Sequence, residues 1–351
     1  MTRTAFIGEC MIELAGTTPG SIFGAANLGF AGDTLNAATY MARTSRLLAA
    51  PSTSDNGDNN DANGDTRVSY ITALGSDPYS DAMIAAWQDD DIDTGLVRRI
   101  DGALPGLYAI QTDDTGERSF SYWRNNAAAK QMLQGGHDAT LRHALAGFDC
   151  LYLSGITLAI LSEQDRKTLI DITARFADQG GKVCFDTNHR PRLWPDQDRA
   201  IASYQAIAPH CDTVLPTFDD DSALFGDTTP SATAQRWHAL GAREVVVKCG
   251  GEPTFFSVRD GDGDGDGDGD GDGEGKGNNN TFRTGTVTPP KVTDIIDTTS
   301  AGDSFNGSYL AARQTGHDVA DAIAIAQKVA ARVISRRGAL VDISDLDLIG
   351  L

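Results

Sequence analysis

Short apolar runs rich in β-branched and aromatic residues alternate along the chain with segments whose apolar positions repeat at helical spacing. The runs predict strands at 5–8, 68–72, 150–153, 183–186, 213–215, 244–248 and 255–258. The amphipathic segments predict helices at 34–48, 81–90, 163–179, 232–240, 301–314 and 319–336. Because parallel strands need crossover helices, this alternation predicts an α/β fold with a mainly parallel sheet covered on both faces. Ligands of such sheets gather at the carboxyl ends of the strands.

Two stretches, 11–30 and 104–125, depart from this alternation. Both are extended and punctuated by turn residues, and the second alternates around 112–116 like a hairpin. We expect them to form a small β-sheet lid over a major domain made of 1–10, 31–103 and 126–351.

Two acidic segments, 51–66 and 260–280, contain too little apolar surface to offset the entropy of ordering them, so we expect mobile surface insertions. The Asp-Gly run of the second suggests calcium, but an EF-hand loop needs a glutamate eleven residues after its first aspartate. Every aspartate of the run is even-numbered, and so is Glu274, so that offset cannot occur. A solvated linker is the favoured interpretation, and loose cation binding stays open.

Composition narrows the class of protein further. The chain has 351 residues, 40% of them hydrophobic, which is enough for a large core in two domains or in one α/β unit with a small appendage. Its net charge of −20 argues against nucleic acid and anionic membranes as partners. The carboxylates are mostly aspartate and lysine is scarce, which favours a halophilic protein over the alternative, an acidic protein of ordinary cytoplasm.

The cysteines and the N-terminal segment indicate a compartment. Five cysteines form no C-x-x-C pair, so neither a disulfide framework nor a thiolate zinc site is indicated. Glu9 and Glu13 interrupt the first apolar stretch, and no run of 18 apolar residues occurs. We therefore expect a cytoplasmic protein.

The segment DTTSAGDSFNGSYLAA at 297–312 carries the most specific chemical signal. The small residues Ser300, Ala301 and Gly302 let the backbone turn tightly into a helix, which leaves amide donors free at its positive end. Asp303 stands beside this anion cradle, where it can take a proton from a hydroxyl. The alternative is an aspartate that caps an ordinary helix.

This motif resembles D-T-x-G-A-G-D, the C-terminal signature of the ribokinase-like (PfkB) carbohydrate kinases, with Ser300 in place of the usual glycine. The resemblance implies a three-layer α/β/α sandwich with a β-sheet lid, and ATP and Mg²⁺ as cofactors. It also implies that Asp303 is the catalytic base and that the amides around Ala301 and Gly302 form the anion hole.

Five further strings resemble the members of this family that phosphorylate 2-keto-3-deoxygluconate: IGECMIEL at 7–14, GDTLNAATYMAR at 32–43, the segment 104–130, LYLSGITLAILS at 151–162 and RPRLW at 190–194. A sugar acid needs fixed cationic forks for its carboxylate and neutral groups for its hydroxyls. The resemblance implies that hydroxyls are held by Gly32, Asp33 and Asn36, that Tyr108 and Tyr122 line the lid side, and that Arg124 and Arg190 meet the acid end. A salt bridge to one of the many aspartates is the alternative for either arginine. Ala31 and His189 depart from the family's glycine and tyrosine.

On the nucleotide side the signals are shorter. The strand EVVVK ends at Lys248 and is followed by a turn that contains Gly250 and Gly251. This segment resembles the family's ATP-side turn, although a glycine turn after a strand is common. Thr217 and Asp220 align with the N-x-x-E element, where a carboxylate acts on magnesium through water; a solvated helix start is the alternative.

The function that follows is ATP-dependent phosphorylation of 2-keto-3-deoxygluconate at its terminal hydroxyl, to give 2-keto-3-deoxy-6-phosphogluconate. The alternatives are kinases of this fold that act on 2-keto-3-deoxygalactonate, fructose, ribose or a nucleoside, and a non-catalytic sugar or nucleotide sensor. The phosphate-binding turns of Rossmann and P-loop proteins are absent from the sequence. The lid sheet has edge strands that could pair with a second copy, so a homo-oligomer through the lid is a further possibility.

Overall fold

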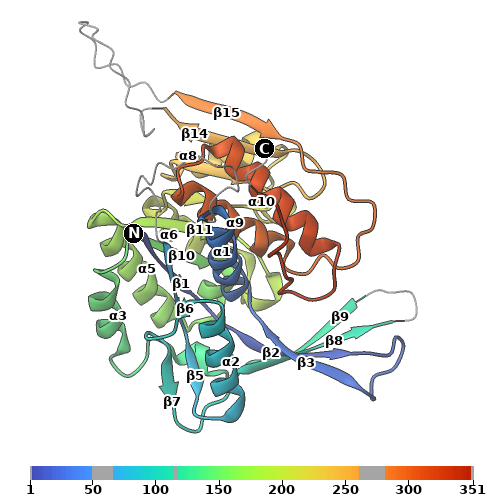
Figure 1. Ribbon diagram of the computed structural model, residues 1–351. Helices are drawn as coiled ribbons and strands as arrows, with labels where there is room; N and C mark the ends of the chain where they lie inside the picture. The colour runs from blue at the N-terminus through green and yellow to red at the C-terminus, as the bar shows by residue number, and fades with distance from the viewer. Residues whose placement is uncertain (1, 50–65, 114–117, 261–280, 349–351) are drawn as a thin grey trace, which may run out of the picture.

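The computed structural model describes residues 2–49, 66–113, 118–260 and 281–348, and it confirms the mainly parallel sheet (Figure 1). The strand order in this nine-stranded sheet is β15-β14-β13-β12-β11-β10-β1-β4-β6. Seven strands run parallel: β1 (Thr2–Ile7), β4 (Thr66–Ile71), β6 (Ile92–Asp93), β10 (Cys150–Ser154), β11 (Lys182–Asp186), β12 (Thr213–Val214) and β13 (Glu244–Val247). The other two, β14 (Thr254–Arg259) and β15 (Phe282–Val287), are antiparallel at one edge.

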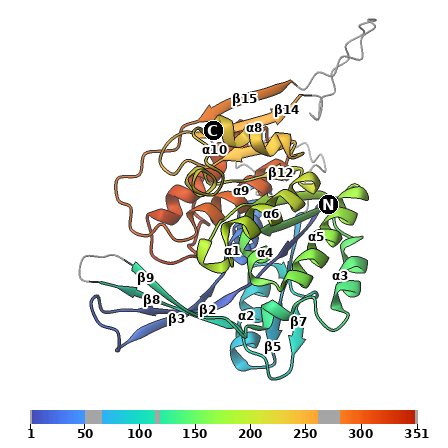
Figure 2. The same cartoon turned by 180° about the vertical axis from the view of Figure 1, so that it is seen from behind.

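Helices cover both faces of this sheet, as the alternation predicts. One face carries α1 (Asp33–Ala49), α2 (Pro78–Asp89), α9 (Ala301–Gln314) and α10 (Val319–Ile334), which lie nearer the viewer in Figure 1. The other carries α3 (His137–Leu145), α4 (Gly155–Ile160), α5 (Glu163–Asp178), α6 (Gln197–Ile207), α7 (Phe218–Phe225) and α8 (Pro230–Ala239), seen in Figure 2. Side chains alternate between the two cores: in β1, Phe6 packs on the first side and Ile7 on the second. The structure is therefore the predicted three-layer sandwich.

The second predicted sheet is also present and projects from the sandwich in both views (Figures 1 and 2). Its order is β3-β2-β8-β9, from β2 (Met11–Gly16), β3 (Ala26–Ala31), β8 (Gly106–Thr112) and β9 (Arg118–Trp123). Strands β8 and β9 pair antiparallel around the predicted hairpin, with Thr112 opposite Arg118. The hairpin tip at 114–117 and nearly all of the two predicted acidic insertions lie outside the described residues.

The sequence pattern missed several short elements, because they contain too few residues to show the repeat of apolar positions that marks a strand or a helix. A two-stranded sheet joins β5 (Ala73–Gly75) to β7 (Arg98–Ile100), and α4 is six residues long with apolar side chains on most sides. Helix α2 begins at Pro78, earlier than predicted, because the Asp77 side chain accepts hydrogen bonds from the amides of Tyr79 and Ser80.

The close approach of α1 and α9 positions the functional site. A Cβ on Gly307 would lie 2.1 Å from the Ala37 carbonyl oxygen, so only glycine lets the two backbones meet there. The N-termini of both helices consequently lie side by side, beyond the carboxyl end of β1. Among the described residues, no helix has the length and apolar content to span a bilayer.

Candidate active site

Asp303 lies in the first turn of α9 and faces the start of α1. The Asn36 amide nitrogen donates a hydrogen bond to one oxygen of Asp303, 2.9 Å away, which fixes the carboxylate toward the junction of the two helices. Burial raises the pKa of Asp303 to about 7, and the nearby Asp33 carboxylate acts in the same direction. A carboxyl group with this pKa is close to half ionised at neutral pH, which suits a group that accepts a proton.

Two backbone amides at this helix end lack an acceptor within the described ranges. The amides of Gly302 and Asp303 make no hydrogen bond there, whereas the Ala301 amide donates to the Thr298 carbonyl at 3.3 Å. The residue before the helix, Ser300, has a left-handed backbone (φ 64°) and its side chain makes no capping hydrogen bond. Of the two residues predicted to form the anion hole, Gly302 has an amide without an acceptor among the described residues, whereas the amide of Ala301 is already engaged.

The first turn of α1 carries the other predicted sugar-binding carboxylate. One oxygen of Asp33 accepts hydrogen bonds from the Ser154 hydroxyl at 2.5 Å and the Asn188 amide at 2.9 Å. Burial raises the pKa of Asp33, although these donors counteract the shift. The Gly32 amide reaches the Asn36 side-chain oxygen at 3.4 Å, so Asn36 is oriented from both ends. The predicted trio of Gly32, Asp33 and Asn36 lies together beside Asp303.

Arg124, predicted to meet the acid end of the sugar, forms an ion pair with the buried Glu9. Glu9 follows β1, and burial raises the pKa of Glu9 despite the neighbouring guanidinium. The other Glu9 oxygen and the Arg124 Nε are both buried and have no partner in the described part of the chain. The arginine is thus oriented and partly neutralised before any ligand binds, and the pair retains unused hydrogen-bonding atoms.

The two predicted lid tyrosines lie on paired strands with ring centroids 5.9 Å apart. Tyr108 is buried and its hydroxyl donates to Glu13, while Tyr122 is 51% exposed. The Arg124 guanidinium lies 5.9 Å from the Tyr122 ring centroid, which connects the lid to the ion pair below it.

Arg190 contacts a predicted magnesium residue. Its guanidinium is 53% exposed and lies 3.4 Å from an Asp220 oxygen, and it also donates to the His189 carbonyl at 2.9 Å. Burial raises the pKa of Asp220, and Arg190 counteracts the shift. His189 itself packs edge-on against Tyr204. Arg190 therefore stands beside the predicted nucleotide side, with its charge shared by Asp220.

Lys248 does not project into solvent from its strand end. It is buried, and its ammonium donates to Asp186 at 3.1 Å and to the Asn306 side-chain oxygen at 2.9 Å. The same nitrogen lies 3.8 Å from where a Cβ on Gly302 would stand, so its positive charge lies next to the free amides. Lys248 therefore lies beside the N-terminus of α9, whose first turn carries Asp303.

The other predicted nucleotide residues surround this strand end. Thr217 pairs with Lys248 in an isolated parallel bridge. Gly250 has φ 60°, and a Cβ on Gly250 or Gly251 would meet no atom within 4 Å, so the turn is open to a ligand. The described residues contain no group of three or more His, Cys, Asp or Glu side chains that would hold a metal.

Several residues of the site escaped prediction: Glu9, Ser154, Asp186, Asn188 and Asn306. Four of them stand at or just after the carboxyl end of a strand, and Asn306 follows Asp303 by one helical turn. Polar residues at strand ends were a usable signal, because ligands of parallel sheets bind at that edge.

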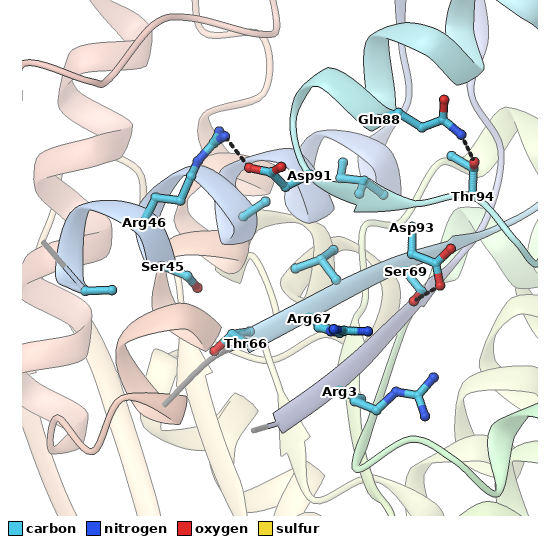
Figure 3. A pocket seen from close by; sticks show the side chains of 14 residues that line it. Arg3, Ser45, Arg46, Thr66, Arg67, Ser69, Gln88, Asp91, Asp93 and Thr94 are labelled. Carbon is cyan, nitrogen blue, oxygen red and sulfur yellow. Dashed lines mark hydrogen bonds and ion pairs between the residues drawn. The ribbon is translucent and has the colours of Figure 1, made fainter. Parts of the chain in front are cut away.

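A separate cavity of about 800 Å³ lies at the opposite edge of the sheet, at the amino ends of β1 and β4 (Figure 3). Arg46 pairs with Asp91 and Ser69 with Asp93 on its walls, and none of the predicted site residues lines it. The cavity is distinct from the candidate active site.

Comparisons with known proteins identify the family. The model of the "pfkB family carbohydrate kinase" matches residues 1–345. The chain is similar to the 2-dehydro-3-deoxygluconokinase of Escherichia coli, at 40% identity over 97% of both chains. It is likewise similar to the enzyme of that name from Haemophilus influenzae, at 36% identity over 97% of this chain and 96% of the relative.

Solved structures share the fold. A PfkB protein from Polaromonas superposes with a TM-score of 0.73 at 24% identity, covering 95% of this chain and 96% of that one. A putative ribokinase from Escherichia coli, in complex with ATP and Mg²⁺, has a TM-score of 0.70 at 20% identity over 97% and 94% of the two chains.

Proposed function

The chain belongs to the pfkB family of carbohydrate kinases, and we propose that it transfers the γ-phosphate of ATP to the terminal hydroxyl of 2-keto-3-deoxygluconate. The observation that carries this proposal is the junction of α1 and α9, where Asn36 fixes the Asp303 carboxylate next to two amides that have no acceptor in the described part of the chain. The full-length relatives named 2-dehydro-3-deoxygluconokinase support the choice of substrate.

In this mechanism Asp303 accepts the proton of the terminal hydroxyl as its oxygen attacks the γ-phosphorus in line. The bond to the β-phosphate oxygen breaks, and ADP and the 6-phosphate ester are the products. The amides of Gly302 and Asp303 and the ammonium of Lys248 hold the charge of the transferring group. Mg²⁺, which the family uses with ATP, neutralises charge on the triphosphate, and Asp220 would hold it through water.

The acid end of the sugar would meet Arg124 and Arg190. Glu9 orients Arg124 through their ion pair, and Arg190, which is 53% exposed, would exchange its contact with Asp220 for one with the sugar carboxylate. Gly32, Asp33 and Asn36 would bind the hydroxyls, with Tyr108 and Tyr122 closing the lid side. Lys248, Thr217 and the turn at Gly250 and Gly251 would hold the nucleotide.

ADP release with ATP, Mg²⁺ and a panel of sugars tests the proposal. We expect turnover with 2-keto-3-deoxygluconate to exceed that with fructose, ribose and a nucleoside, and the 2-keto-3-deoxygalactonate epimer serves as the stringent comparison. Equal or higher turnover with a neutral sugar would reject the substrate assignment. Absence of ADP release with every sugar would favour a sensor.

We also propose that two copies associate through their lids. The edge strand β3 carries Leu28, 57% exposed, and the edge strand β9 carries Trp123, 62% exposed. Apolar side chains on open sheet edges favour pairing with a second sheet. Light scattering on the purified protein tests this, since Leu28→Lys with Trp123→Lys should then convert dimer to monomer.

A further inference from the structure

Ser300 combines two unfavourable features at the start of α9. Its backbone is left-handed, with φ 64° and ψ 11°, a conformation that costs a serine more than a glycine. Its residue surface is 9% exposed, and its hydroxyl oxygen is buried without a hydrogen-bond partner among the described residues. A strained residue with an unsatisfied buried donor is typical of a functional site. A ligand that accepts a hydrogen bond from the hydroxyl would offset the free energy lost to strain and to the missing hydrogen bond.

The left-handed backbone also explains why the helix end is open. A serine before a helix usually has extended backbone, and its oxygen then accepts a hydrogen bond from the second or third amide of the helix. Those two amides belong here to Gly302 and Asp303, and both lack an acceptor within the described ranges. The side chain of Ser300 thus leaves free the donors that it would otherwise cap, and it keeps its own proton free as well.

We propose that the Ser300 hydroxyl donates a hydrogen bond to the phosphoryl group in transfer, beside the amides of Gly302 and Asp303. The inference rests on the proposed kinase function and adds a hydroxyl donor to the two backbone amides and the ammonium of Lys248. The hydroxyl keeps its proton, so Asp303 still takes the proton of the sugar. The ammonium of Lys248 lies 3.8 Å from the position of a Cβ on Gly302, so its positive charge would face the same phosphoryl group.

Two substitutions separate the hydroxyl from the backbone strain. Ser300→Gly removes the hydroxyl and relieves the left-handed cost, whereas Ser300→Ala removes the hydroxyl and retains that cost. A hydrogen bond to a charged group is worth roughly a tenfold change in rate or more, so we expect both variants to lose about 10-fold or more in kcat. The KM for the sugar should change little, because the donor meets the phosphoryl group.

Asp91→Gly is the matched control. Asp91 is also a non-glycine residue with a left-handed backbone (φ 61°), but it lies on the surface far along the chain from the site, paired to Arg46. We expect this variant to keep the wild-type kcat. Ser300→Gly should unfold at a higher temperature than Ser300→Ala, which verifies that the strain was relieved in a folded protein.

Wild-type turnover is measured first, so that absence of kinase activity, which would remove the proposed function, is distinguished from failure of this inference. A Ser300→Gly enzyme as fast as the wild type would overturn the role of the hydroxyl. So would a loss in Ser300→Ala alone, because strain and not the donor would then explain it.

Discussion

Asp303→Asn should make the folded protein more stable while it removes the proposed base. The folded-state pKa of Asp303 is about 7, above its ordinary value of 3.8, so the folded protein binds this proton more tightly than the unfolded chain. Ionising the group in the fold therefore costs stability. That cost is absent below the unfolded pKa, grows as pH rises from about 4 to 7, and is complete above pH 7. The neutral amide never bears it, and its oxygen can still accept the hydrogen bond from Asn36.

The magnitude follows from the size of the pKa shift. Each pKa unit corresponds to about 1.4 kcal/mol, so a shift of about three units costs on the order of 4 kcal/mol at pH 8. At pH 5, about one pH unit above the pKa of the unfolded chain, this cost is only about one unit, roughly 1.5 kcal/mol. The advantage of Asp303→Asn in unfolding free energy should thus grow by roughly 2.5 kcal/mol between pH 5 and pH 8.

Urea unfolding of both proteins at the two pH values measures this difference. Asp89→Asn, an identical change on the exposed surface of α2, controls for the loss of one negative charge on an acidic protein and should show no such trend. An advantage that is equal at both pH values, or a destabilised Asp303→Asn at pH 8, would refute the elevated pKa.

Two further predictions follow from contacts of the site, and a third follows from the composition of the chain. Lys248→Met removes the cation beside Asp186 and the amides, so the pKa of Asp303 should rise and the acid limb of the kcat/KM profile should move to higher pH; an unmoved limb would place Lys248 outside the site's electrostatics. Arg124→Gln and Arg190→Gln should each raise the KM for the sugar acid by about tenfold or more, because each removes a charge-assisted hydrogen bond, with the KM for ATP changing less; unchanged values would point to a neutral substrate. If the acidic composition is a halophilic adaptation, the temperature of the unfolding midpoint should rise from dilute to molar KCl. The similar enzymes named above do not support a halophilic origin. An unchanged midpoint would favour the alternative, an acidic protein of ordinary cytoplasm.

The long elements were predictable because their apolar periods are set by burial. Helix α9 spans 301–314 as predicted, and the strands on either side of β10 were found because they are buried on both faces. The two-residue strand β6 and the six-residue helix α4 are too short to show a period. Helix α6 was not predicted, although the sequence contained a signal for its start. Asp196 caps the helix, because its side chain accepts a hydrogen bond from the Arg199 amide.

The site was predictable at the level of motifs and unpredictable at the level of contacts. The sequence places Asp303 in a helix start but cannot show that Asn36, 267 positions away, donates to it. Lys248 resembles a surface residue of a glycine turn, yet the fold buries its side chain against Asp186 and Asn306. Such pairings depend on the closeness of helices and strand ends that only the tertiary structure brings together.

Turnover of Asp303→Asn with 2-keto-3-deoxygluconate, ATP and Mg²⁺ tests the central claim most directly, when sugar binding is measured on the same sample by calorimetry. We expect sugar affinity close to that of the wild type and a loss in kcat on the order of 10²-fold or more, because the variant cannot take the hydroxyl proton. Turnover near the wild-type value with intact binding would contradict the assignment of Asp303 as the base.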